Sequence, residues 1–380
     1  MNGPTDPTRL LRLPDAVDPY PMEPSDEELA DSLGLPRDAV LRFDMNTLGG
    51  GPLPSVHRAL RGYDPARVVE YGDQAYRALR RALATLTGAA EHRIIPGAGA
   101  DELIRLATTM VVGTGDAVVV PTPTFPMFAV EARLAGGRVV EVPRTSPGER
   151  QSAAVLRAAA EAHGARLVWI CSPNNPTADQ YEPDEIAAVA DGLPAIVVVD
   201  AVYQEFAEAS LGEPPEARSL IPLQERLPNL LVLRSLAKSH GLAGARIGYL
   251  VVPDGLAARF DAARLPLAVG GPSEAAALAA LAEPEEARER HRRILDERER
   301  VAARLVSAGW AVLPSVTNFL LVRPDGPAAE WATALMARGL VVRSYPGGPL
   351  VDWLRITVRS ADENARLLAG IEEIAAARGA

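Results

Sequence analysis

Short apolar runs alternate with amphipathic segments through the middle of the chain. The apolar runs predict buried strands at residues 116–120, 138–142, 166–171 and 195–200. Helical spacing of apolar residues fills the intervals, at about 151–163 and from about Pro183. Strands that alternate with helices form a mostly parallel sheet covered on both faces. The pattern therefore predicts an α/β fold whose large domain has three layers, α/β/α.

The pattern changes towards the C-terminus. Helical spacing begins near residue 254, and residues 283–304 carry the dense alternating charge that is typical of a solvated helix face. Further elements follow: strands near 311, at 318–322, near 341 and at 353–358, and helices at about 327–338 and from about 362. We expect a large domain at 46–265 and a smaller α+β domain at 266–380.

The N-terminal segment lacks such a pattern. Residues 1–40 hold seven prolines, which break regular structure. Within them, Ser25 and Glu28 form the two ends of a capping box, which predicts a short helix that stops at Gly34. We expect residues 1–45 to be an arm that lies on another surface.

Composition excludes several classes of function. The formal charge of −10 and pI near 5.2 argue against a nucleic-acid or anionic membrane surface. One cysteine, Cys171, cannot form an internal disulfide, and the histidines show no metal-ligand spacing. No apolar run has membrane-spanning length, and the N-terminus lacks a basic segment followed by an apolar one. A cytoplasmic protein without a metal site is expected.

Lys238 is the only lysine, and the other 38 of the 39 Lys+Arg residues are arginine. Arginine replaces lysine where a charge suffices, but not where the amine reacts, because guanidinium stays protonated. A buried amine near a carbonyl cofactor can form a Schiff base. By count alone, a chance survivor on the surface is equally compatible. The flanking Ser235 and Arg246 favour a reactive site, since a hydroxyl and a guanidinium there could hold a phosphate.

Polar residues at predicted strand ends support a site. Asn175 and Asp200 follow buried runs, and ligands of parallel sheets bind beyond the carboxyl ends of the strands. Asp200 could instead cap a helix. The turn at 97–102 leads from an apolar run into a helix, whose exposed amides can bind phosphate. It lacks the third glycine of G-x-G-x-x-G and has no G-K-[ST], so a nucleotide site is the weaker interpretation.

The stretch from Ser235 to Tyr249 resembles the lysine segment of fold-type I pyridoxal-phosphate (PLP) enzymes. It is closest to the histidinol-phosphate aminotransferase branch of the class I/II aminotransferases, whose pattern is S-x-S-K-x-x-G-L-A-G-x-R-x-G-Y. The resemblance covers roughly residues 40–370. It implies a PLP-transferase fold, a homodimer with shared active sites, and the cofactor pyridoxal 5′-phosphate.

The resemblance also implies individual roles. Lys238 would bind the cofactor and move a proton, with Asp200 on the pyridine nitrogen and Asn175 and Tyr203 on the phenol oxygen. The implied phosphate contacts are Gly99, Ala100, Asp101, Ser235 and Arg246, with Tyr71 reaching the phosphate of the partner subunit.

Three further positions follow from the same resemblance, each with an alternative. Phe125 would stack on the pyridine ring, or else belong to the core. Arg355, in Leu-Arg-Ile-Thr-Val, would bind the anionic group of the substrate, or else form a buried salt bridge. Asn46 would lie near the substrate, or else in a flexible turn, because the match around 46–52 is partial.

Several positions depart from the family pattern. Ala237 replaces a hydroxyl residue, His240 an aromatic one, Gly72 a proline and Ala178 a glycine. Arg359 stands where glycine is usual, where it would add a second anion contact or narrow the pocket.

The expected reaction is transamination between a small amino acid or amino-phosphate and a keto acid. One alternative keeps the cofactor but breaks another bond at Cα, as in a decarboxylase. A second is a non-enzymatic module that binds PLP or has lost it. The substrate and the pathway are not assigned by the sequence.

Overall fold

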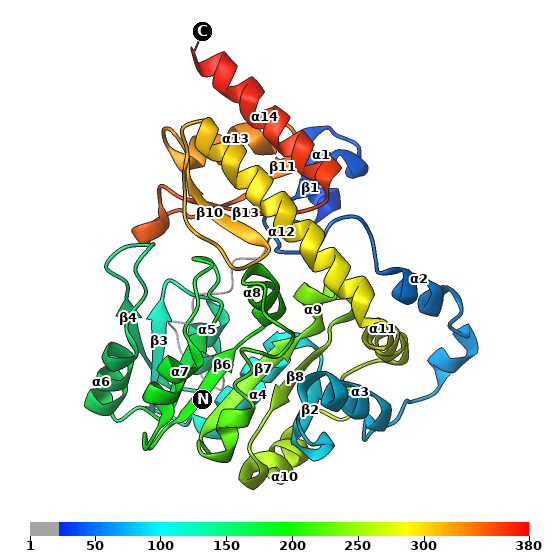
Figure 1. Cartoon of the computed structure of the whole chain (residues 1–380), viewed down its shortest axis with the longest axis vertical. Helices are drawn as coiled ribbons and strands as arrows, with labels where there is room; N and C mark the ends of the chain where they lie inside the picture. Colours follow the sequence, from blue (N-terminus) through cyan, green and yellow to red (C-terminus); the bar gives the residue numbers. More distant parts are fainter. Residues whose placement is uncertain (1–22, 380) are drawn as a thin grey trace, which may run out of the picture.

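The computed structural model describes residues 23–379 and contains a large central sheet (Figure 1). Its strand order is β2-β8-β7-β6-β5-β3-β4. The strands are β2 (Ile94–Gly97), β3 (Ala117–Thr122), β4 (Arg138–Pro143), β5 (Leu167–Cys171), β6 (Ile196–Asp200), β7 (Leu230–Ser235) and β8 (Gly248–Val251). In this sheet β8 alone points opposite to the other strands, so the predicted mostly parallel arrangement is confirmed.

Helices cover both faces of this sheet because successive strand residues point to opposite sides. Val118 and Val120 pack with helices on one face, and Val119 packs with helices on the other. The first face carries α4 (Gly99–Val111), α5 (Met127–Leu134) and α10 (Asp254–Ala263), and the second carries α6 (Ala153–His163) and α7 (Pro183–Ala190). The three-layer prediction is therefore confirmed.

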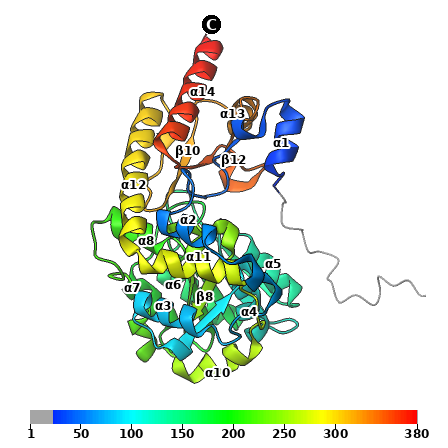
Figure 2. The same cartoon turned by 90° about the vertical axis from the view of Figure 1, so that its right-hand side faces the viewer.

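A second, antiparallel sheet lies beside the first, and Figure 2 shows it with α12 and α14 above the large sheet. Its order is β12 (Arg343–Ser344), β13 (Leu354–Thr357), β10 (Phe319–Arg323) and β9 (Ala311–Val312). Helices α12 (Pro284–Ser307), α13 (Ala328–Met336) and α14 (Ala361–Gly379) pack against it. The strand expected near 341 proves to be two, β11 (Leu340–Val341) and β12.

The described part of the N-terminal segment lies against this second region. Helix α1 (Asp26–Leu33) has the predicted capping box at Ser25 and ends at Gly34, whose φ is 65°. Strand β1 (Leu41–Arg42) then pairs in parallel with β11. Residues 1–22 of the predicted arm lie outside the described residues. The division at 45 and 265 stays a prediction.

Five further α-helices complete the described fold. They are α2 (Pro54–Arg61), α3 (Arg77–Thr87), α8 (Gln204–Ser210), α9 (Leu236–Ser239) and α11 (Gly271–Ala282). None of the helices within residues 23–379 combines the length and hydropathy needed to span a lipid bilayer.

Candidate active site

Most of the predicted site residues meet in one cavity of about 640 Å³ between the two sheets. The members that line it are Asn46, Ala100, Asp101, Phe125, Asn175, Asp200, Tyr203, Ser235, Lys238, Arg246 and Arg355. Strand direction explains the gathering. Asp200 and Ser235 end the parallel strands β6 and β7, and Asn175 follows β5, so all three emerge at one edge. Lys238 lies in the short helix α9 that begins directly after β7.

The amine of Lys238 points into this cavity and donates a hydrogen bond to the Met45 carbonyl oxygen at 3.1 Å. Burial, and then the positive charge of Arg355, lower its pKa from 10.5 to about 8. About one amine in ten is then unprotonated at pH 7. A nucleophilic, proton-accepting nitrogen is therefore present at neutral pH.

Asp200 is buried, with 3% of the residue exposed. Its Oδ1 accepts one hydrogen bond, from the Val202 amide at 3.2 Å. Burial raises its pKa to about 7, because the loss of water destabilises the ionised form more than the Val202 amide and the charge of Lys238 stabilise it. A protonated ring nitrogen beside this carboxylate would stabilise the ionised form further, so the site fits a pyridinium.

The start of helix α4 forms a narrow backbone turn. Gly99 has φ 85°, and a Cβ added there would lie 2.7 Å from Nη2 of Arg246. That same Nη2 donates to Asp101 at 2.8 Å. An exposed helix start beside a guanidinium fits a phosphate. Ser235 Oγ donates to the Ile247 carbonyl at 3.1 Å, so its hydroxyl would have to rotate to join such a cradle.

Hydrogen bonds hold Asn46 in place, which favours a position in the site over the flexible-turn alternative. It is 2% exposed, and its side-chain amide donates to the Tyr203 hydroxyl at 3.0 Å. Thr357 accepts from the Asn46 backbone amide at 2.9 Å and donates to its side-chain oxygen at 3.1 Å. Burial raises the pKa of Tyr203, which keeps its phenol protonated and able to donate.

Arg355 crosses the cavity from the second sheet. It donates to the Asn175 side-chain oxygen at 2.5 Å and to the Asp44 carbonyl oxygen. Its Nε is buried and has no hydrogen-bond partner within residues 23–379, and no carboxylate of that part of the chain forms an ion pair with it. The alternative role of Arg355, a buried salt bridge, is therefore not present among the described residues.

The structure adds cavity residues that sequence reasoning missed. Arg343 on β12 lies directly opposite Arg355 on β13, and both line the cavity. Tyr345 follows on the same chain segment, and its buried hydroxyl has no hydrogen-bond partner in the described chain. No local motif marks these residues. Only the antiparallel register places the two arginines directly opposite each other.

Two predicted residues lie outside the cavity lining. Gly99 lies in the backbone turn described above. Tyr71 is 86% exposed in the loop after the 3-10 turn Pro65–Val69. Phe125 lines the cavity and also packs edge-on against Phe128, with ring centroids 5.8 Å apart. Its stacking on a pyridine ring stays a prediction.

Three of the departures from the family pattern have local structural surroundings, and Ala237 lines the cavity. Arg359 is not among the cavity residues; it donates to the Arg42 carbonyl at 3.1 Å and pairs with Glu363 at 2.7 Å. His240 is buried and hydrogen-bonded to Ser239 at 2.8 Å, and burial lowers its pKa to about 4, so the ring is neutral at neutral pH. Ala178 adopts φ 62°, the region that a glycine favours.

Comparisons with known proteins identify the family of this chain. The sequence model of the family described as aminotransferase class I and II matches residues 38–371. The histidinol-phosphate aminotransferase of Roseiflexus castenholzii is 38% identical over 379 residues, which is 97% of this chain and 99% of the relative. The corresponding protein of Methanoculleus marisnigri is 32% identical, with 92% and 94% covered.

A solved structure is similar throughout. The histidinol-phosphate aminotransferase from Sinorhizobium meliloti, in complex with pyridoxal-5′-phosphate, has a TM-score of 0.84 and 31% identity, with 94% of this chain and 95% of that chain covered. Because the family match spans most of the sequence, this chain belongs to the class I and II aminotransferases, as a PLP-dependent transaminase of the histidinol-phosphate aminotransferase-like branch.

Proposed function

We propose that this enzyme transfers the amino group of a substrate that carries an anionic group, as histidinol phosphate does, to a keto acid. The observation that carries the proposal is the cavity itself. It holds an amine whose pKa is about 8 together with two guanidinium groups on adjacent strands, those of Arg343 and Arg355. An amine suits the reaction, and paired guanidinium groups suit a phosphate or a carboxylate.

Cavity residues from the large sheet would hold the cofactor. Asp200 faces a ring nitrogen, Asn175 and Tyr203 bind the phenol oxygen, and Phe125 covers the ring. The phosphate would be bound by Gly99, Ala100, Asp101, Ser235 and Arg246. Support comes from the buried carboxyl group of Asp200 and from the cradle beside Arg246, where a Cβ on Gly99 would not fit.

PLP, when bound, withdraws electrons from the substrate Cα and accepts its amino group. The chain supplies the proton movements. Lys238 Nζ removes the proton from the substrate Cα, and its lowered pKa keeps it able to do so at neutral pH. Asp200 supplies the negative charge that keeps the ring nitrogen protonated, and the Tyr203 hydroxyl keeps its proton and donates.

The second sheet would orient the substrate. Arg355 is held by neutral oxygens of Asn175 and Asp44, which leaves its positive charge without a carboxylate in the described chain. A substrate anion would supply that charge. The names of the similar proteins point to a phosphate ester as the anionic group.

A homodimer is part of the proposal. Large apolar side chains gather around one exposed region: Val68, Val69 and Tyr71 are 65%, 82% and 86% exposed, and Leu265 is 61% exposed. Arg264 donates to the Gln74 carbonyl at 2.6 Å, which brings these two segments together. Exposed apolar patches mark interfaces. Tyr71 would then reach the partner's site. Sedimentation of the wild type and of Tyr71→Ala can test whether the chain forms a dimer and whether Tyr71 stabilises it.

The single cysteine supports a cytoplasmic location.

The reaction is tested by mixing the holoenzyme with histidinol phosphate, with other amino phosphates and with amino acids, each without a keto acid. Transamination converts the cofactor absorbance to that of pyridoxamine phosphate and releases a keto product. Release of carbon dioxide instead would replace the proposal by decarboxylation. A spectrum that no compound changes would contradict both.

A further inference from the structure

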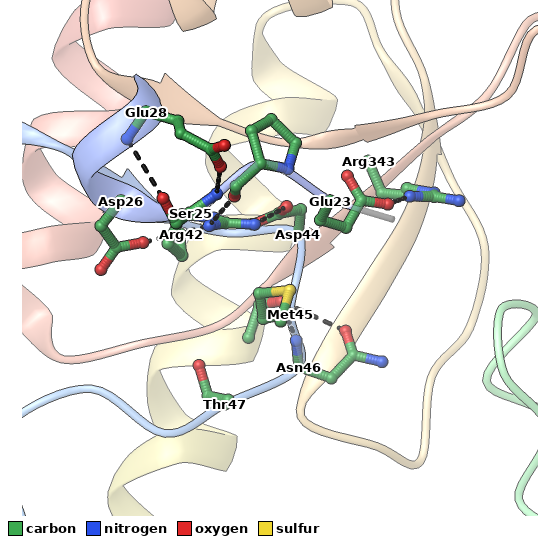
Figure 3. A network of polar contacts seen from close by, with 12 residues as sticks. Glu23, Ser25, Asp26, Glu28, Arg42, Asp44, Met45, Asn46, Thr47 and Arg343 are labelled. Carbon is green, nitrogen blue, oxygen red and sulfur yellow. Dashed lines mark hydrogen bonds and ion pairs between the residues drawn. The ribbon is translucent and has the colours of Figure 1, made fainter. Parts of the chain in front are cut away.

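The mouth of the cavity contains an ion pair that none of the proposed catalytic roles uses. Glu23, just before α1, pairs with Arg343, and each side chain is 26% exposed (Figure 3). Arg343 is the cavity residue that lies opposite Arg355 in the second sheet. Glu23 also lines the cavity. A carboxylate from the N-terminal segment therefore lies against one of the two guanidinium groups that face the substrate.

A second set of contacts fixes the position of this segment. Arg42 donates to the Pro24 carbonyl at 2.9 Å and to Asp26 at 3.0 Å. It also forms a two-pronged contact with Asp44, with both distances 2.8 Å (Figure 3). Asp44 in turn accepts from Arg355 through its carbonyl oxygen. These contacts form a ring. It runs from Glu23 and the adjoining Pro24 through Arg42 and Asp44 to Arg355, and it closes through the strand pairing of Arg355 with Arg343.

Charge explains why this ring matters. Like charges directly opposite each other on paired strands repel. Arg343 and Arg355 are such a pair, and Arg355 has only neutral partners in the described chain. Glu23 is thus the carboxylate that offsets the repulsion. An anionic substrate group would offset it as well, and would compete with Glu23 for Arg343.

We propose that Glu23 is a substrate-displaced counter-ion of Arg343, so that it sets how strongly the cavity binds anions. This inference rests on the proposed anionic substrate. Binding of a dianion costs the Glu23–Arg343 contact, and the cost discriminates against small anions that make few other contacts. Glu23 is a specificity-determining residue and takes no part in proton transfer.

The test measures binding of inorganic phosphate to the holoenzyme, in which the phosphate site of the cofactor is filled. Calorimetry is applied to the wild type, Glu23→Gln, Arg343→Gln and the double variant. Glu27→Gln is the matched control, because Glu27 pairs with Arg37 at 3.0 Å on the exposed side of α1, away from the cavity. Loss of the competing carboxylate should lower the dissociation constant of phosphate about three- to tenfold in Glu23→Gln.

The control should stay within about twofold of the wild type, and the double variant should match Arg343→Gln, since Glu23 acts only through that arginine. An unchanged or weaker affinity in Glu23→Gln overturns the inference, as does the absence of measurable binding to any variant. Weaker binding would mean that Glu23 itself helps to bind the ligand.

The proposed function can fail separately. Calorimetry with phosphate requires no turnover. If no amino phosphate is transaminated but Glu23→Gln binds phosphate more tightly, the counter-ion role stands and the substrate assignment falls. If amino phosphates react but Glu23→Gln binds phosphate as the wild type does, the substrate assignment stands and the counter-ion role falls.

Discussion

The two walls of the cavity are built differently. The wall from the large sheet places Lys238, Asp200 and Asn175 at the ends of adjacent strands or directly after them. The wall from the second sheet consists of residues within or just after short antiparallel strands, among them Arg343, Tyr345 and Arg355. The first wall is encoded in local sequence motifs, and the second depends on strand register.

Their electrostatics differ as well. On the first wall, burial moves the pKa of Lys238 down to about 8 and that of Asp200 up to about 7, which brings both groups into the range where protons move at neutral pH. The second wall contributes the guanidinium groups of Arg343 and Arg355, which suit an anion. We infer that the first wall performs the chemistry and the second selects the substrate. The following predictions test that division.

Replacing Lys238 by Ala should have the largest effect. Without Nζ, the proton at the substrate Cα has no acceptor, and we expect activity to fall at least about a thousandfold. Borohydride treatment followed by peptide mass spectrometry should locate the cofactor on residue 238 in the wild type only. An unmodified Lys238, or a Lys238→Arg variant as active as the parent, would contradict the assignment.

Asp200→Asn should come next. The amide keeps the shape but removes the charge that holds a ring nitrogen protonated, and we expect kcat to fall about 10²- to 10³-fold with cofactor still bound. Asp184→Asn, on the exposed start of α7, serves as the control. Steady-state kinetics would count against the proposed role if the two variants behaved alike.

The lowered pKa of Lys238 predicts how pH affects cofactor uptake by the apoprotein. Only the unprotonated amine attacks an aldehyde, so the rate should rise about tenfold per pH unit and level off above about pH 8. A lysine with the ordinary pKa of 10.5 would give a rate that still rises at pH 10. Stopped-flow absorbance between pH 6 and 10 distinguishes the two profiles.

Neutral substitutions on the second wall should affect binding more than chemistry. Arg355→Gln should raise KM for an anionic amino substrate about ten- to a hundredfold, and Arg343→Gln about tenfold, because each removes a charged hydrogen-bond donor. Arg323→Gln, exposed on β10 outside the cavity, is the control. If these variants lost activity mainly in kcat, the second wall would take part in the chemistry, contrary to the inference.

The smallest effect concerns two glycines with the same backbone conformation. Gly99 and Gly115 both have φ 85°, but a Cβ meets Arg246 at the former and has no heavy atom within 4 Å at the latter. Substitution by Ala should cost about 1 kcal/mol of folding stability at either position. Only Gly99→Ala should also weaken cofactor binding, by about fivefold. Equal cofactor affinities in a spectral titration would remove Gly99 from the phosphate cradle.

The sequence predicted only some of the site residues. The turn at 97–102 and the residues at strand ends were predicted because glycine, phosphate-binding amides and strand termini leave local signals. Asn46 was left open, since its burial depends on Thr357, which lies 311 residues away in sequence. Tyr71 stays a prediction, because its expected contact belongs to a partner subunit.

The sequence by itself determined the layered fold, the reactive lysine and the strand-end residues, because hydrophobic periodicity and local motifs are properties of neighbouring residues. Only the tertiary structure decided that Arg343 faces Arg355, that Arg359 braces the segment at 42–47, and that Glu23 reaches the cavity. These placements depend on strand register and on packing between segments about 300 residues apart. No local sequence pattern predicts contacts between such distant residues, because only folding brings them together.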